Sequence, residues 1–426
     1  MPATPSLNRG KRLAFWSVLL LSLAAFAWLA SVVARATAGY LYVKTQPPGW
    51  RGRVLRPDPV LGVAPIPGAT GEEIIASGFG TPVRFDREGL RIPVHAPPRG
   101  RPRPAVMALG CSFTFGSGCN ARETYPARVA HALGGRTLNA AFPGYGLAQM
   151  LVQARELVPR HRPEILLVQA SPWLPARAAR RVRRTRFDLL PTPYFVTGEG
   201  GKPQWRPPLF ASKALQLPIS PYRETDRALL DWASFVGRIG FPLFLHDDAL
   251  RLYLHVGRKA GTLPPGAPEQ AISRLVYPEI LRLCRESGTR MVVVVLEGAG
   301  RWTFQASDLG LPPDVLVVDT KPGLYAGLHS ADAETYLRAY GQWRGTPPHL
   351  VDEHPNARAH AIIAEQVLAE LGRDLPGTPV LAIPGHGAYG VSHSTHTPAA
   401  VGPTRSGGGP TRAKRRWTTM RRSPSA

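Results

Sequence analysis

The chain has 426 residues, and its 44% hydrophobic content is enough for one large domain or two average ones. Proline is spread over many loops and no repeat of solenoid length occurs, which excludes a fibrous or solenoid protein. Lys and Arg number 52 against 29 Asp and Glu, a formal charge of +23. Such a charge suits nucleic acid, anionic lipid or an acidic polymer as a binding partner. Which of these the protein can meet depends on its location.

An uncharged apolar segment at residues 13–34 is long enough to cross the ~30 Å hydrocarbon core of a membrane as a helix. The basic residues of 1–12 precede it and favour a cytoplasmic N-terminus, although Arg35 and Lys44 weaken the asymmetry. The sequence thus predicts a single-pass anchor in the inner (cytoplasmic) membrane, with the catalytic domain on the periplasmic or extracellular side. A cleaved signal peptide is the alternative, since 24–38 is rich in small residues, but the apolar run exceeds the usual ~7–15 residues.

The predicted location bears on the basic charge, because an exported protein does not meet chromosomal DNA. We therefore expect no nucleic-acid partner. The basic charge instead suits anionic lipid, cell-wall polymers or acidic polysaccharide as a partner. A solvated surface shaped by compositional bias is the simpler alternative. The densest basic run inside the domain comprises Arg177, Arg180, Arg181, Arg183, Arg184 and Arg186.

After the anchor, residues 35–100 form a Pro- and Gly-rich lead-in segment with strand-like stretches at 82–85 and 89–93. A domain at 101–376 follows, in which short strands and helices alternate. The predicted strands are 105–109, 137–141, 164–170, 290–296 and 315–319, and the predicted helices are 122–133, 147–158, 268–287 and 357–371. This alternation predicts an α/β fold of three layers, α/β/α, with a central parallel sheet.

Two segments depart from the alternating pattern. An aromatic- and Arg-rich insertion at 172–265, with a predicted helix at 224–238, is typical of a lid or a substrate wall. Residues 377–426 lose regular pattern and carry many basic residues, which predicts a disordered basic tail.

Two distant segments carry residues that suit nucleophilic catalysis. Ser112 follows the strand at 105–109, while Asp352 and His354 lie two residues apart near the C-terminal end of the domain. A serine hydroxyl needs an imidazole to take its proton, and the imidazole needs a carboxylate to fix its tautomer. Ser112 would attack an ester, His354 would be the base, and Asp352 would orient it. Each assignment has an alternative: Ser112 could be a helix N-cap, His354 an exposed loop residue, and Asp352 or Glu353 a cap for the following helix.

Other reactive residue types give little signal. The three cysteines, Cys111, Cys119 and Cys284, are an odd number and imply no disulfide framework. Neither they nor the scattered histidines have the spacing of zinc ligands, so we predict no metal and no cofactor.

Three blocks of the chain resemble the SGNH hydrolases, also called GDSL esterases and lipases. The blocks are residues 110–116, 138–146 and 352–356. In the first block, Cys111 occupies the position where Asp is commonest in the family. The resemblance implies the SGNH/flavodoxin-like form of the α/β fold. It also implies that Asp352, rather than Glu353, orients His354. It also implies an oxyanion hole made by the backbone N–H groups of Ser112 and Gly144.

One block of this family is incomplete here. An Asn that donates to the oxyanion should follow the strand at 164–170, but the sequence there contains none, and Ser171 or Trp173 is the candidate replacement. Loss of such a donor typically costs ~10²-fold or more in rate.

The first hypothesis is an anchored esterase that removes an acyl group, in particular acetyl, from a carbohydrate or lipid. The alternatives are a polysaccharide O-acetyltransferase and an inactive wall- or glycan-binding scaffold.

Overall fold

The structure is a computed structural model. It describes residues 9–45, 49–76, 79–94, 106–184, 189–209, 224–225, 231–299 and 305–374. The predicted disordered tail at 377–426 lies outside these residues, as do Arg186 and most of 210–230.

The centre of the fold is a parallel sheet. Its strands, in spatial order, are β8 (Thr137–Asn139), β7 (Val106–Leu109), β9 (Ile165–Ala170), β15 (Arg290–Val295) and β16 (Leu316–Asp319). Each coincides with a predicted strand to within two residues at either end. Because β7 pairs with both β8 and β9, the loops after these three strands meet at one edge of the sheet.

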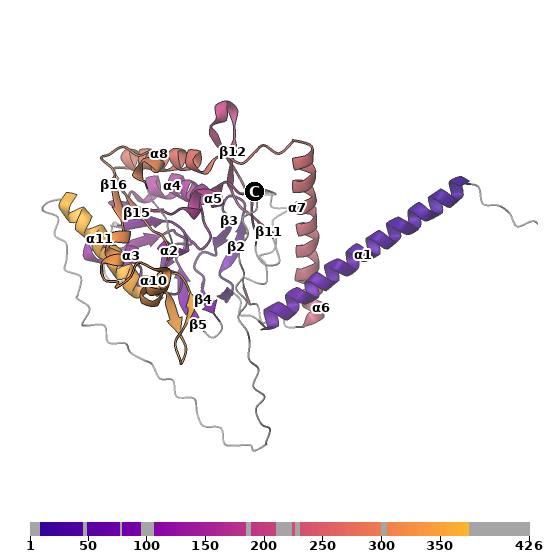
Figure 1. Cartoon of the computed structure of the whole chain (residues 1–426), viewed down its shortest axis with the longest axis horizontal. Coiled ribbons are helices and arrows are strands. Elements are labelled where there is room, and N and C mark those ends of the chain that lie inside the picture. The colour runs from indigo at the N-terminus through magenta and orange to yellow at the C-terminus, as the bar shows by residue number, and fades with distance from the viewer. Residues whose placement is uncertain are drawn as a thin grey trace, which may run out of the picture. The chain divides into compact units, whose positions relative to one another are not determined.

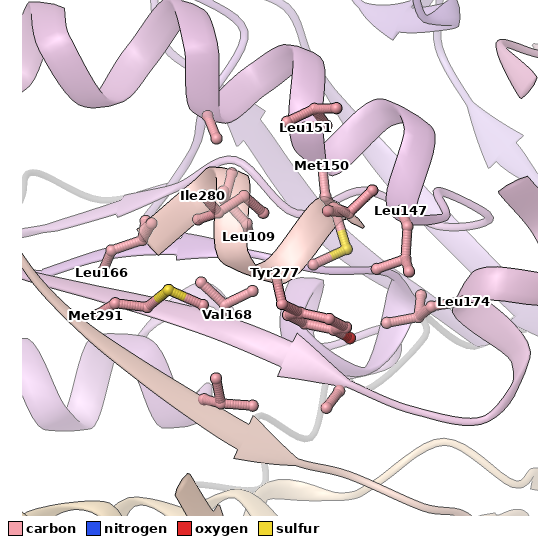
Figure 2. Close-up of a cluster of buried hydrophobic side chains, with 14 of the residues drawn as sticks. Leu109, Leu147, Met150, Leu151, Leu166, Val168, Leu174, Tyr277, Ile280 and Met291 are labelled. Carbon is pink, nitrogen blue, oxygen red and sulfur yellow. The ribbon is translucent and has the colours of Figure 1, made fainter. Parts of the chain in front are cut away.

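Alternation along the strands gives the sheet its two helical layers. Leu166 and Val168 of β9 belong to one apolar cluster, and Ile165 and Leu167 belong to the opposite one. All six side chains of β9 are buried, as is typical of a central parallel strand. The first face is covered by α4 (Leu147–His161) and α8 (Glu269–Ser287), the second by α3 (Tyr125–Ala132) and α11 (Ala357–Asp374) (Figures 1 and 2).

The three-layer α/β/α fold predicted from the sequence is therefore present. Figure 2 shows the first cluster, where Leu109 and Val168 of the strands meet Met150 of α4 and Ile280 of α8. The chain also forms shorter elements that the sequence did not predict. They are η1 (Ala121–Glu123), η6 (Ala306–Leu309), α9 (Lys321–Ala326), α10 (Ala333–Tyr340), β17 (Gln342–Arg344) and β18 (His349–Asp352).

The segment at 35–100 contributes more strands than the two strand-like stretches predicted at 82–85 and 89–93. It supplies strands that extend the sheet antiparallel from β8, namely β6 (Arg91–Ile92), β5 (Phe79–Phe85), β4 (Thr70–Ala76) and β1 (Trp50–Arg51), with β14 (Glu224–Thr225) beside β1. A hairpin of β2 (Leu55–Asp58) and β3 (Gly62–Pro65) accompanies them. The sheet is therefore mixed, with a parallel centre and an antiparallel extension.

These strands join the fold through an aromatic cluster. Trp50 stacks on Phe142 with ring centroids 5.8 Å apart, and Phe115 lies edge-on to both rings. Because Phe115 follows Ser112 by three residues, the packing of the N-terminal strands bears directly on the candidate site.

The apolar segment at 13–34 forms part of one long helix, α1 (Arg9–Thr45). Within its stretch Arg9–Leu41, an 18-residue window has a mean hydropathy of 2.2 and is only 6% buried, so the helix is long and apolar enough to cross a membrane. A signal sequence near the N-terminus has the same properties.

The insertion at 172–265 contains several short elements before a long helix. They are α5 (Trp173–Ala178), β10 (Val182–Arg184), β11 (Leu189–Pro191), β12 (Tyr194–Thr197), η2 (Glu199–Gly201) and β13 (Pro203–Arg206). The helix predicted at 224–238 is wrong in position. Asp231 accepts a hydrogen bond from the Ser234 N–H at 2.8 Å and so caps α6 (Trp232–Phe235), which continues through the π-helical η5 (Val236–Gly240) into α7 (Phe241–Lys259).

Candidate active site

Ser112 lies at the carboxyl end of the central strand β7. Strand β7 ends at Leu109, and the short helix α2 (Ser112–Phe115) begins three residues later. Gly110 makes the turn possible, because a Cβ there would lie 2.5 Å from Gln169 Oε1. Gly116 then ends the helix in the left-handed conformation, with φ of 83°. The result is a strand, a tight turn and a helix that begins with the candidate nucleophile.

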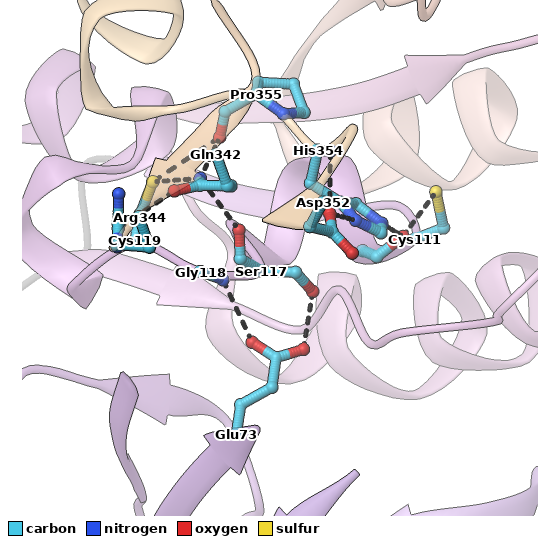
Figure 3. A network of polar contacts seen from close by, with 11 residues as sticks. Glu73, Cys111, Ser117, Gly118, Cys119, Gln342, Arg344, Asp352, His354 and Pro355 are labelled. Carbon is cyan, nitrogen blue, oxygen red and sulfur yellow. Dashed lines mark hydrogen bonds and ion pairs between the residues drawn. The ribbon is translucent and has the colours of Figure 1, made fainter. Parts of the chain in front are cut away.

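The structure brings Ser112, His354 and Asp352 into one hydrogen-bonded chain. The Oγ of Ser112 is 2.7 Å from Nε2 of His354, although 242 positions separate the two residues in the sequence. Nδ1 of His354 is hydrogen-bonded to Oδ1 of Asp352, which also accepts the backbone N–H of His354 at 2.8 Å. The neighbouring Glu353 is exposed. In Figure 3 the side chains of Asp352 and His354 point toward each other beside Cys111.

Local hydrogen bonds fix the loop that carries His354. Asn356 donates from Nδ2 to the carbonyls of Ala339 and Gly341, both at 3.0 Å. Its Oδ1 accepts the Ala359 N–H at 3.0 Å and so caps α11. On the other side, Gln342 of β17 donates to the Pro355 carbonyl at 3.1 Å. The imidazole is therefore positioned by the ends of β18 and α11.

Electrostatics favour a charged pair at this site. Burial opposes ionisation of Asp352, but its hydrogen bond and charge interaction with His354 outweigh burial, so the pKa of the carboxyl is lowered. Burial likewise opposes protonation of His354, but Asp352 outweighs it and the pKa of the imidazole is raised. Asp352 thus has the charge and position to stabilise an imidazolium.

A buried carboxylate that sequence reasoning missed lies nearby. Glu73 of β4 accepts hydrogen bonds from Ser117 Oγ at 2.6 Å and from the Gly118 N–H at 3.3 Å (Figure 3). Burial raises the pKa of Glu73, and its charge is among the causes that raise the pKa of His354. Arg91 of β6, also buried, donates to the carbonyls of Phe115, Gly116 and Cys119. Two residues of the lead-in segment therefore hold the turn that follows Ser112.

The loop bearing Gly144 is tied to the same strand end. The Phe142 N–H donates to the Gly110 carbonyl at 3.2 Å, and Ala140 donates to Ala108 at 3.0 Å. Gly144 itself has a φ of 86°, which side chains rarely tolerate. Its backbone conformation is thus one that glycine favours, in a loop anchored beside the turn that leads to Ser112.

The two candidate replacements for the missing Asn differ in orientation. Ser171 accepts a hydrogen bond from Gln169 Nε2 at 2.8 Å and donates to the Leu296 carbonyl, so its hydroxyl is engaged within the core. Trp173 instead directs its indole Nε1 toward Cys111 Sγ at 3.4 Å, and Cys111 precedes Ser112. Its ring also contacts Phe113, with centroids 5.0 Å apart, and Phe113 lies 5.2 Å from the ring of His354.

Gln169 organises this part of the site. Its Oε1 accepts the Cys111 N–H at 2.9 Å and the Thr114 hydroxyl at 2.8 Å, and its Nε2 donates to Cys111 Sγ at 3.2 Å. The end of β9 is therefore linked to both sides of Ser112. Gln169 was not among the predicted site residues, although a polar residue at the end of an apolar strand was visible in the sequence.

Comparison with known proteins adds the following. No family model matches the chain, and no curated protein matches it. Its structural neighbours include GDSL proteins and acylhydrolases. A lipolytic protein of the G-D-S-L family from Desulfitobacterium hafniense DCB-2 is 10% identical with a TM-score of 0.29, and the match covers 62% of this chain and 98% of that one.

Two further neighbours have similar scores. A catalytic mutant of Axe2, an acetylxylan esterase from Geobacillus stearothermophilus, is 13% identical with a TM-score of 0.31, over 64% of this chain and 96% of that one. The salicylyl-acyltransferase SsfX3 from a tetracycline biosynthetic pathway is 12% identical with a TM-score of 0.31, and the match covers 64% of this chain and 57% of that one.

The raised pKa of His354 predicts a pH dependence. A general base must be neutral, so ester turnover should fall on the acid side at a higher pH than for an ordinary histidine. In Asp352→Asn the carboxylate charge, a leading cause that raises this pKa, is lost, and the acid limb should move to lower pH. The value of kcat/KM should fall by ~10²–10⁴-fold because the imidazolium loses its counter-charge. The pH profile of kcat/KM tests this. An unmoved acid limb would show that another group titrates.

Proposed function

We propose that the protein is a serine esterase of the SGNH/GDSL type that uses Ser112, His354 and Asp352 to remove an acyl group, in particular acetyl, from a carbohydrate or lipid. The observation that carries this proposal is the continuous hydrogen-bonded chain from Ser112 Oγ through His354 to Asp352. A lone Ser112 acting as a helix cap would need no imidazole at 2.7 Å, whereas a nucleophile does.

The reaction follows from the positions of these groups. His354 takes the Ser112 proton as the oxygen attacks the ester carbonyl, and the tetrahedral oxyanion forms near the turn at Gly110 and Cys111. We assign its stabilisation to the backbone N–H groups of Ser112 and Gly144 and to the indole N–H of Trp173. His354 then protonates the leaving alcohol. Water, activated by the same imidazole, releases the acid from the acyl-enzyme.

We further propose that residues 13–34 anchor the protein in the cytoplasmic membrane. The domain at 101–376 would then lie on the periplasmic or extracellular side, since the basic residues of 1–12 favour the cytoplasm. The proposal is supported by the length and exposure of α1, whose apolar stretch is almost unburied. An enzyme held in this way would meet acylated glycans or lipids outside the cytoplasm.

Acyl transfer is a second candidate, and the aromatic cluster at the site favours it. Phe113 packs on both Trp173 and His354, so apolar rings cover one side of the imidazole that would activate water. A site that excludes water while admitting a sugar hydroxyl would pass the acyl group to that hydroxyl. Comparing acetate release with acetyl transfer to added oligosaccharides separates the two reactions.

The full chain in nonionic detergent should react covalently with a fluorophosphonate probe and release acetate from an aryl acetate. Ser112→Ala should abolish labelling, since the phosphonate bonds to the activated serine oxygen. Ser287→Ala, at the carboxyl end of α8, is the matched control and should label like the wild type. A folded wild-type protein that does not label would favour the inactive scaffold.

A further inference from the structure

A cavity lined by arginines lies beside Gly144. Its volume is about 600 Å³, and its described lining includes Arg177, Arg180, Arg181, Arg183 and Arg258. The other described lining residues are Gly144, Gln149, Ala179, Val182, Thr192 and Leu254, so none of those described is acidic. Like charges gathered in a partly enclosed space repel one another, and a bound anion would relieve that repulsion.

The cavity adjoins the loop that carries the proposed oxyanion glycine. A Cβ on Gly144 would lie 1.5 Å from Arg183 Nη1, so the guanidinium group lies directly against this glycine. Arg177 donates from Nη1 to the carbonyl of Tyr145 at 3.0 Å, one residue further on. Two arginines of the cavity therefore contact the loop that forms one side of the candidate active site.

Contacts within the insertion hold the other arginines. Arg181 donates to the Pro264 carbonyl and lies 5.3 Å from the ring of Tyr194, which holds its guanidinium in place. Leu254 of α7 packs with Leu189 and Leu250, and this packing positions Arg258 one turn later on the same helix. Arg177 thus comes from α5, Arg183 from β10 and Arg258 from α7. Arg180 and Arg181 lie between α5 and β10, and the fold brings all five arginines to one cavity.

We propose that this cavity binds the carboxylates of an acidic oligosaccharide and so presents an ester on that glycan to Ser112. The inference rests on the proposed esterase function and names its substrate class. Guanidinium groups bind carboxylates through paired hydrogen bonds. Several arginines along one cavity suit a chain whose charges repeat from sugar to sugar. Among the described lining residues, the apolar side chains are Ala179, Val182 and Leu254, which make a poor surface for a lipid acyl chain.

Binding of tetragalacturonic acid to the full chain in nonionic detergent tests the proposal, with maltotetraose as the neutral tetramer of similar size. The wild type and Ser112→Ala should bind tetragalacturonate with equal Kd, since the arginines and not the nucleophile hold it. The double variant Arg180→Gln, Arg258→Gln should bind it at least about tenfold more weakly, because it loses two charged partners. Added salt should weaken wild-type binding.

Arg338→Gln is the matched control, because Arg338 is exposed on α10, outside the cavity lining. It should bind like the wild type, and thermal unfolding should show all variants folded. If the double variant does not fold, Arg258→Gln alone, at the exposed end of α7, replaces it.

Three results would overturn the inference. The first is equal binding of tetragalacturonate by the cavity variant and the wild type, and the second is equal binding of maltotetraose and tetragalacturonate by the wild type. The third is displacement of tetragalacturonate by phosphatidylglycerol in mixed micelles at a lower concentration than by a neutral lipid. The last would assign the cavity to a lipid surface. Binding is also measured in Ser112→Ala, so it does not depend on catalysis. If tetragalacturonate binds but the wild type turns over no ester, the cavity is an anion site and the proposed esterase function is wrong.

Discussion

Ser112→Ala should reduce kcat/KM for an aryl acetate by on the order of 10³-fold or more, with little change in thermal stability. The Oγ of Ser112 is the atom that would form the acyl-enzyme, and the 2.7 Å contact to His354 Nε2 is its route for proton loss. The side chain is buried, but it is small, and its removal opens little space. The loss should therefore appear in catalysis rather than in folding.

A second substitution tests whether these residues act as a unit. His354→Ala should cost about as much as Ser112→Ala, and the double variant should be little worse than either one. Such non-additivity arises because neither group catalyses the reaction alone. Purely structural residues would instead give effects that add and that accompany loss of stability. Steady-state kinetics with thermal unfolding of the same three proteins distinguishes the two cases.

The sequence predicted the parts of the site that lie in short local patterns. The buried strands 105–109 and 164–170 were recognisable as apolar runs, and the residues after them could be placed at one sheet edge. Ser112 and the pair Asp352 and His354 could be named because each lies in a compact block. Their approach across 242 positions is a property of the tertiary structure, and the structure supplies it.

The sequence could not show the role of the N-terminal strands. Glu73 and Arg91 lie in a Pro- and Gly-rich segment, where single charged residues are usually solvated. Both are buried because β4, β5 and β6 extend the sheet across the turn after Ser112. Such pairing depends on long-range strand register, for which a segment of short irregular strands carries little periodic signal.

The replacement for the missing Asn was also open in the sequence, because Ser171 and Trp173 both carry a donor. Only the geometry distinguishes them. The hydroxyl of Ser171 is already engaged with Gln169 and the Leu296 carbonyl. The Trp173 N–H has a sulfur atom as its acceptor at 3.4 Å, which is a weak partner that a developing oxyanion would outcompete.

Trp173→Phe should therefore lower kcat by ~10²-fold and leave KM nearly unchanged, because the indole N–H would act on the oxyanion of the transition state and not on the ground-state ester. Phenylalanine keeps an aromatic ring against Phe113, so the packing that adjoins His354 is largely retained. Steady-state kinetics of the aryl acetate reaction measures the change.

Trp205→Phe provides a matched control for this substitution. Trp205 of β13 packs against the same apolar cluster as Trp173, and its buried Nε1 has no hydrogen-bond partner among the described residues. The same loss of an N–H there should leave kcat unchanged. If Trp173→Phe is no slower than Trp205→Phe, the backbone N–H groups of Ser112 and Gly144 stabilise the oxyanion without a side-chain donor. If it is slower only through a raised KM, Trp173 binds the substrate and does not contact the oxyanion.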